Sequence, residues 1–431
     1  MTKNIHSMML SLTETLLYFG LLALGLLGVQ WFEQYRKSSK CPKDKKRVPV
    51  VKHRLPFVGN GIAFSKDIVG YIRECYKIYG PVFRMKIFRT EIVVICDRKL
   101  TDEYFNKKEN DMSLYRVLDR LYFADAFADD PGNLDTIIRT VRNSVRVNFG
   151  QFAPKIMEEG YLMVERMRKE AEENGNNVNL KDQIVRFIAR TSSRCFVSFE
   201  ITDHFFELLS KFSDLLNKIV VLTYFVPKWL LRLIFNPFLR RYRIKMINLM
   251  MPTIQSYRTD PTKNESLVIR KALEMKIQGK DGKERGLNDR EIGEILICLL
   301  YVSSENTALG LTSTLLDLAN NPEYWKQVQE TSKQAVDENN HNVLFSDRII
   351  DACAMESARM NSHIFALNRE PLQGINTLGD YFVGDVDCVA LCEPMLMVYD
   401  AATDVFTDPE TYNPDRFIVD GEKNDARSVM T

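Results

Sequence analysis

The chain has 431 residues, 45% of them hydrophobic and 27% charged, which is the composition of a globular protein with a sizeable core. This excludes a disordered chain, a collagen-like repeat and a small disulfide scaffold. Lys and Arg number 58 against 57 Asp and Glu, a net charge of +1, so no overall field attracts nucleic acid and we expect no such partner. The eight cysteines are scattered, which predicts buried thiols in a reducing compartment and no metal site.

An uncharged segment near the N-terminus is long enough to cross a bilayer. Residues 15–32 carry no charge, and a helix of that length extends about 27 Å. Seven basic residues follow between Arg36 and Arg47, opposed only by Asp44. This predicts a tail at 1–14 and a single-pass membrane anchor at 15–32, with the body on the cytoplasmic face of an endoplasmic-reticulum-type membrane. A cleaved signal peptide and a buried core helix are the alternatives.

Prolines mark the link between the anchor and the body. Pro42, Pro49 and Pro56 resist helix formation, so residues 33–56 are predicted to form a basic, extended linker. The remaining residues, 57–431, form the predicted body.

The body reads as mostly helical with small β-sheets. Residues 68–79 have helical apolar spacing and end at a Gly-Pro pair, and residues 82–96 suggest two strands joined by a turn at Arg89 and Thr90. Residues 99–369 read as helices, and a strand signal returns near 381–398. We therefore expect small sheets at the two ends of a large helical body.

Two surface-like stretches leave alternatives open. Residues 220–241 are rich in apolar and aromatic side chains around two prolines, and form either core helix ends or a surface that dips into the membrane. Arg139, Arg142 and Arg146 share one face of a helix. That face is either solvated or binds an anion or a partner.

Four segments in the second half of the chain place polar or charged residues where the surrounding sequence is apolar or has regular structure. Residues 292–324 form one long apolar helix interrupted by Ser303–Thr307, where polar groups would carry a desolvation cost unless they line a wet pocket or a cofactor site. Glu356 and Arg359 have the i, i+3 spacing of a helical ion pair. Arg369 follows in an extended region, and Arg416 lies in the sequence NPDRF.

The order of ExxR, a further arginine, a β segment and NPDRF resembles the cytochrome P-450 superfamily of haem-thiolate monooxygenases. Residues 114–123, 188–198 and 382–394 are most similar to sterol 14-demethylases, with the prostacyclin synthase and cholesterol hydroxylase group as a second possibility. The resemblance implies the cytochrome P-450 fold, mostly α with small β-sheets, and a haem cofactor.

The resemblance also implies roles for particular residues. Glu356, Arg359 and Arg416 match the buried ion-pair network of the family, in which each charge needs the others. Arg369 matches an arginine that pairs with a haem propionate. Tyr115 and Phe123 match aromatic positions lining the haem and substrate cavity. Together with Arg139, Arg369 and Tyr115 are the cofactor-binding candidates.

Glu305, Asn306 and Thr307 match the oxygen-activating stretch and are the catalytic candidates. Asn306 replaces the usual threonine, and an amide donates a hydrogen bond but cannot relay a proton as a hydroxyl does. The larger departure is that the FxxGxxxCxG loop, whose cysteine thiolate binds the iron, does not follow NPDRF before Thr431. We therefore predict a chain that is C-terminally truncated relative to the family, with no axial iron ligand.

The resemblance implies a membrane-anchored haem monooxygenase of a sterol or related lipid, supplied with electrons by an NADPH-dependent reductase. The missing cysteine favours an alternative, a catalytically inactive relative that binds lipid or is vestigial. An unrelated helical scaffold anchored in a membrane is a third hypothesis.

Overall fold

The computed structural model describes residues 41–418 apart from 54, 56–57, 145–148, 261, 264–265, 279–281, 338–346, 362–364, 373–375 and 393–405. The predicted tail, the predicted anchor, the first part of the predicted linker and Arg146 lie outside the described residues, and so does the sequence after residue 418.

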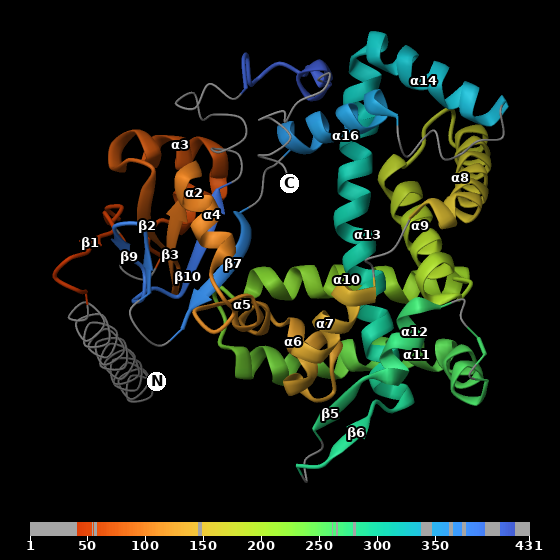
Figure 1. Ribbon diagram of the computed structural model, residues 1–431, viewed down its shortest axis with the longest axis horizontal. Coiled ribbons are helices and arrows are strands. Elements are labelled where there is room, and N and C mark those ends of the chain that lie inside the picture. Colours follow the sequence, from red (N-terminus) through yellow and green to blue (C-terminus); the bar gives the residue numbers. More distant parts are fainter. Residues whose placement is uncertain are drawn as a thin grey trace, which may run out of the picture.

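The described residues form a helical part and a sheet part (Figure 1). The helices are α2 (Gly61–Lys66), α3 (Ile68–Tyr79), α4 (Arg98–Asn106), α5 (Leu114–Arg120), α6 (Phe123–Phe127), α7 (Leu134–Ser144), α8 (Ala153–Glu173), α9 (Leu180–Ser192), α10 (Asp203–Leu222), α11 (Lys228–Thr259), α12 (Leu267–Glu274), α13 (Asp289–Asn320), α14 (Pro322–Asp337) and α16 (Arg348–Met360). The strands are β1 (Lys46–Arg47), β2 (Val82–Ile87), β3 (Thr90–Ile95), β4 (Met112–Ser113), β5 (Lys276–Gln278), β6 (Glu284–Gly286), β7 (Phe365–Pro371), β8 (Thr377–Leu378), β9 (Tyr381–Phe382) and β10 (Cys388–Cys392).

The main sheet joins segments from both ends of the chain. Its strand order is β2-β3-β10-β7-β4, with β10 parallel to β3 and antiparallel to β7. The expectation of separate sheets at the two ends was therefore wrong, because the apolar strands β3 and β10 bury each other in the middle of one sheet. The C-terminal strands also begin earlier than predicted, since β7 starts at Phe365. A smaller sheet pairs β1, β9 and β8.

Several local predictions are confirmed. Helix α3 has the predicted bounds and ends where Gly80 takes a φ of 85°, a backbone conformation that favours glycine. The predicted hairpin is β2 and β3. The eight cysteines all belong to the described part of the chain, where none forms a disulfide and seven are buried.

Helix α13 is the centre of the helical part and packs against α7, α9, α11, α12 and α16. It begins at a capping box, in which the Asn288 side chain accepts from the Glu291 amide and Glu291 bonds back to the Asn288 amide. Its first half, Ile292–Tyr301, is buried throughout. It ends at Asn320, before the predicted end, because the chain turns there and Pro322 starts α14.

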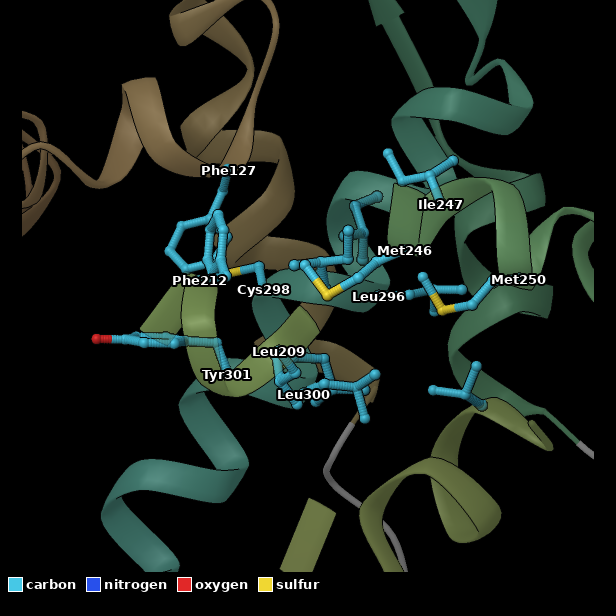
Figure 2. Packing of buried hydrophobic residues seen from close by; sticks show 14 of the residues in the cluster. Phe127, Leu209, Phe212, Met246, Ile247, Met250, Leu296, Cys298, Leu300 and Tyr301 are labelled. Atoms are coloured by element: carbon cyan, nitrogen blue, oxygen red, sulfur yellow. The ribbon is translucent and has the colours of Figure 1, made fainter. Parts of the chain in front are cut away.

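The contact between α11 and α13 is close. Figure 2 shows Met246, Ile247 and Met250 of α11 beside Leu296 of α13. A Cβ atom added at Gly293 would lie 2.8 Å from Ile247 Cγ2, so this position requires glycine for the helices to approach. Among the described helices, only α13 is long and apolar enough to cross a membrane, and half of its most apolar window is buried inside the protein.

Candidate active site

The predicted catalytic residues lie where α13 emerges from the core. Glu305 is half-buried and lines a cavity of about 250 Å³ between α9, α10 and α13. The other lining residues are mainly polar: Asn179, Lys181 and Asp182 at the start of α9, Ser210, Ser213, Asp214 and Asn217 on α10, and Ser304 on α13, with Val185, Phe206 and Leu209. This polar cavity brings carboxylate, hydroxyl and amide groups together around Glu305.

Tyr301 and Asn217 were not predicted, yet both lie at this cavity or beside it. The Tyr301 hydroxyl donates a hydrogen bond to Asn217 Oδ1 at 2.9 Å. Two causes raise the pKa of Tyr301: mainly its burial, and to a lesser degree the nearby carboxylate of Glu305. The hydroxyl therefore stays protonated and remains a hydrogen-bond donor. The only sequence signal for Tyr301 is its position one helical turn before Glu305.

Asn306 and Thr307 do not line the polar cavity. Both are exposed, because each residue turns the helix by about 100° and moves its side chain to another face. Val302 and Leu309, which are 38% and 56% exposed, share this open face of α13 with Asn306. A Cβ added at Gly310 would meet nothing within 4 Å. Glu305 therefore lies at the boundary between the polar cavity and an open, partly apolar helix face.

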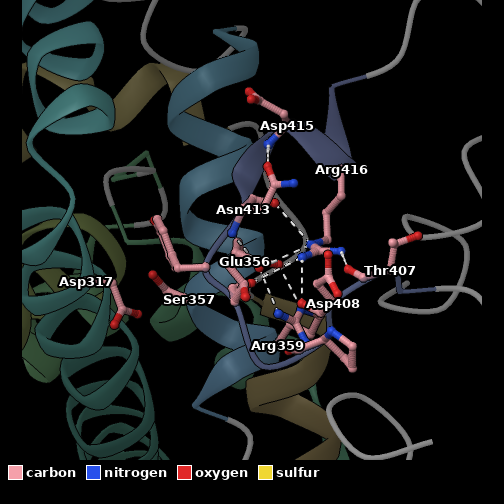
Figure 3. A network of polar contacts seen from close by, with 12 residues as sticks. Asp317, Glu356, Ser357, Arg359, Thr407, Asp408, Asn413, Asp415 and Arg416 are labelled. Atoms are coloured by element: carbon pink, nitrogen blue, oxygen red, sulfur yellow. Dashed lines mark hydrogen bonds and ion pairs between the residues drawn. The ribbon is translucent and has the colours of Figure 1, made fainter. Parts of the chain in front are cut away.

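The predicted ion-pair network is assembled between α16 and the residues around 413 (Figure 3). Arg359 donates from Nε and Nη2 to the two oxygens of Glu356, both at 2.7 Å. Arg416 Nε donates to the same carboxylate at 3.2 Å, as does the amide of Asn413 at 2.9 Å. The side chains of Glu356 and Arg359 are fully buried, so each charge depends on the others for compensation.

This network attaches the segment 406–418 to α16. Arg359 Nη1 donates to the carbonyl of Pro409 at 2.7 Å, and Arg416 Nη1 donates to the carbonyl of Thr407 at 2.7 Å. The arginines therefore satisfy backbone carbonyls that no regular secondary structure pairs.

Two of the cofactor-binding candidates meet at a shared acid. Arg139 Nη2 lies 3.2 Å from Asp135 Oδ2, and both side chains are about half exposed. The same carboxylate also acts on Tyr115, whose pKa is raised first by burial and then by Asp135. Asp135 was not predicted, although it lies one helical turn before Arg139 on α7.

The third candidate, Arg369, lies elsewhere. Its guanidinium donates to the backbone carbonyls of Tyr104 and Lys107, both at 2.9 Å. It thereby caps the C-terminal end of α4, where carbonyls lack helical partners. In this arrangement two of its nitrogens are already bonded to backbone. Phe123, which was predicted to line a cavity, packs edge-to-face with Tyr301 at 6.0 Å between ring centres.

A haem fits the described residues in part only. The open face of α13 offers the apolar side chains of Val302 and Leu309. Burial raises the pKa of Cys298 and Cys388 to about 12 and that of Cys195 and Cys353 to about 11. Burial therefore disfavours the thiolate form, which is the form that binds iron, at these four cysteines.

The comparisons with known proteins agree on the family. The cytochrome P-450 family model matches residues 49–429. The probable lanosterol 14-alpha demethylase of Acanthamoeba polyphaga mimivirus is 44% identical over 412 residues, which cover 94% of this chain and 57% of that relative. The chain thus spans less than two thirds of the length of this relative. The sterol 14-demethylase of Arabidopsis thaliana is 25% identical over 403 residues, covering 90% of this chain and 80% of the plant protein.

A solved structure shows the same fold. Retinoic acid-bound cyanobacterial CYP120A1 has a TM-score of 0.61 and 17% identity, covering 89% of this chain and 86% of that structure.

Proposed function

The chain belongs to the cytochrome P-450 family, and on this premise we propose that it acts in the haem-dependent monooxygenation of a sterol or related lipid. The observation that carries the proposal is the 44% identity to a probable lanosterol 14-alpha demethylase over 94% of the chain. A bound haem supplies the activation of oxygen in this family. An NADPH-dependent reductase is the proposed source of electrons.

In this function Glu305 moves a proton. Its carboxylate lies between the polar cavity and the open face of α13, so it is positioned to take a proton from the cavity and pass it to that face. The Asn306 amide can donate a hydrogen bond, and the hydroxyl of Thr307, the next residue, could relay a proton.

We also propose that an apolar surface on α10 and α11 lies on a lipid bilayer. Its exposed side chains are Val221, Phe225, Trp229, Leu233, Ile234 and Phe238. The Phe225 ring packs 4.0 Å from Phe88, in the turn between β2 and β3, so the surface continues toward the N-terminal part of the sheet. The basic side chains of Lys228 and Arg232 beside it are paired with Asp119 and Asp125, so the proposed contact depends on the apolar side chains. An anchor at 15–32 would hold this surface at the membrane.

A second candidate function is sterol binding without catalysis. The burial of seven of the eight thiols favours it, because burial disfavours the thiolate form that binds iron. Sterol binding without catalysis would still use the apolar interior and the proposed membrane surface, and it requires no oxygen chemistry.

The experiment that separates the two uses the full chain purified from cells supplied with a haem precursor. Bound haem is quantified as its pyridine complex, and the reduced protein is treated with carbon monoxide. Monooxygenation predicts stoichiometric haem with the Soret band of a thiolate complex, and conversion of lanosterol when reductase and NADPH are added. Haem-free protein that still binds radiolabelled lanosterol would reject monooxygenation and support sterol binding. Protein that binds neither would reject both.

A further inference from the structure

The polar cavity between α9, α10 and α13 is lined by more negative than positive charge. Its acidic side chains are Asp182 of α9, Asp214 of α10 and Glu305 of α13, and its basic side chain is Lys181 of α9. Three carboxylates therefore face one ammonium group. Asp182 and Asp214 are exposed, whereas Glu305 is half-buried, so the acids extend from the outer end of the cavity inward.

These three carboxylates are unpaired. Within the part of the chain that the structure describes, no side chain or backbone amide donates a hydrogen bond to any of them or forms an ion pair with it. Other acids of α10 differ in this respect, because Asp203 pairs with Arg186 and Glu207 with Lys211. The cavity thus collects acids that lack a cation.

A buried hydroxyl lines the same cavity. Ser213 is 6% exposed, and its side chain makes no hydrogen bond with any residue that the structure describes. A helical serine often bonds back to the carbonyl four residues earlier, as Ser304 does to Leu300 at 2.6 Å. A buried polar group without a partner costs free energy. Ser213 therefore marks the inner end of the cavity as a place for a ligand that forms hydrogen bonds.

An organic cation suits these groups better than an anion or a metal ion. The start of α9 does not attract an anion, because the amide of Asp182 already donates to Asn179 Oδ1 at 3.2 Å. No group of three His, Cys, Asp or Glu in the described residues could hold a metal ion. An ammonium group, by contrast, donates up to three hydrogen bonds and can reach acceptors on different helices.

The size and the apolar part of the cavity indicate the kind of ammonium ion. Its volume of about 250 Å³ equals the liquid volume of about eight waters. Val185, Phe206 and Leu209 add apolar side chains to the lining, which favour contact with methylene groups. A short aliphatic chain that carries separated ammonium groups matches both properties.

We propose that the polar cavity binds an aliphatic diamine or polyamine. One ammonium group bonds to Glu305 and Ser213 at the inner end, and another lies near Asp182 and Asp214 at the outer end. The inference goes beyond the proposed function, because it requires neither bound haem nor a sterol, and its test measures binding alone.

Calorimetric titration of the full chain in a neutral detergent tests the site. The solution contains about 0.1 M NaCl, in which exposed charges act over only about 10 Å. Spermidine and 1,4-diaminobutane should each bind saturably, one molecule per chain. The probe 1,4-butanediol, which has hydroxyls in place of the ammonium groups, should not bind. No saturable binding of either amine, equal binding of the diol, or binding of Mg²⁺ as tight as that of the amines would overturn the proposal.

Variants locate the binding in the cavity. Glu305→Gln should weaken spermidine binding about tenfold or more, and Ser213→Ala about three- to tenfold, because each removes an acceptor for the ammonium group. The fold should tolerate Ser213→Ala, since this hydroxyl makes no hydrogen bond with the described residues. The matched control is Glu207→Gln, which removes the same charge from α10 outside the cavity and should change binding less than about twofold.

Thermal unfolding gives a second measurement. Because a ligand that binds the folded chain stabilises it, spermidine should raise the Tm of the wild type and of Glu207→Gln but raise that of Glu305→Gln much less. Equal weakening in Glu207→Gln and Glu305→Gln would show a general attraction between an amine and surface acids, and would reject the site.

Discussion

The carboxylate of Glu294 on α13 lies 3.7 Å from the guanidinium Nε of Arg243 on α11, and both side chains are only 2% exposed. Glu294 also accepts a hydrogen bond from the amide of Asp129 at 2.8 Å. The pair therefore joins the central helix α13 to α11 in the core.

This relationship predicts a pH dependence of stability. Burial raises the pKa of Glu294 from 4.5 to about 7, although Arg243, Arg290 and the Asp129 amide favour its charged form, and the Asp129 carboxylate opposes it. Between pH 4.5 and about pH 7, the Glu294 carboxyl therefore keeps its proton in the folded chain but has lost it in the unfolded chain. The free energy of unfolding should therefore fall by about 3 kcal/mol as the pH rises through this window.

Glu294→Gln isolates that contribution, because glutamine cannot ionise. Denaturant unfolding at about pH 5 and pH 8 should show wild type and variant similar at the lower pH and the variant more stable at the higher pH. Glu330→Gln, which changes an exposed residue of α14, is the control. If wild type and Glu294→Gln follow parallel pH curves, the carboxylate is not protonated in the folded chain.

Arg359→Ala should be strongly destabilising. It leaves the fully buried Glu356 without its bidentate partner and removes the donor to the Pro409 carbonyl. Breaking a buried pair on one side costs about 3–5 kcal/mol, to be measured as a shift in the denaturant midpoint. Arg168→Ala breaks an exposed pair with Glu165 on α8 and should cost less than about 1 kcal/mol. Similar losses for both variants would mean that the Glu356 network does not hold the segment 406–418.

Two glycines of α13 should respond in opposite directions to the same substitution. Gly293→Ala places a Cβ against Ile247 and should cost about 1–3 kcal/mol. Gly310→Ala meets nothing within 4 Å and should stabilise the helix by up to about 1 kcal/mol. Thermal unfolding of both variants makes the comparison. Adding Ile247→Ala to Gly293→Ala should recover part of the loss, and strictly additive losses would show that the two positions are not in contact.

Glu305→Gln tests the proposed proton transfer. If the chain catalyses sterol monooxygenation, this variant should lower kcat by about 10²-fold or more, since it removes an acid-base group. Its solvent isotope effect should also exceed that of the wild type, while sterol binding remains similar. Glu330→Gln again serves as the control. An unchanged kcat would assign proton delivery to another group, and a loss confined to sterol binding would place Glu305 in the substrate site.

Local features of the fold were predictable because neighbouring residues determine them. Helix α3 and the β2–β3 hairpin have their predicted positions, since apolar spacing and the Gly80 stop act over a few residues. The pairing of Glu356 with Arg359 also follows from i, i+3 spacing on one helix. The anchor at 15–32 lies outside the described residues and stays a prediction.

The site was predicted less completely. Glu305 was placed on the central helix, but Asn217 and Asp135 were missed, because each gains its meaning from a partner on another element. Arg369 was predicted to meet a haem propionate, which stays a prediction, and its hydrogen bonds to the carbonyls of Tyr104 and Lys107 at the end of α4 were not predicted. The ion pairs of Arg232 with Asp125 and of Arg243 with Asp129 were also missed, since these partners are 107 and 114 residues apart in the sequence.

The sequence by itself determined the helical composition, the position of the central helix and the membership in a family, because apolar periodicity and short motifs are written in adjacent residues. Only the tertiary structure decided that the strands from both ends form one sheet, that Glu305 faces a polar cavity while Asn306 is exposed, and that α11 is tied to α6 by charges. Those outcomes depend on which buried surfaces and opposite charges meet once the chain has folded, and neither is visible along the chain.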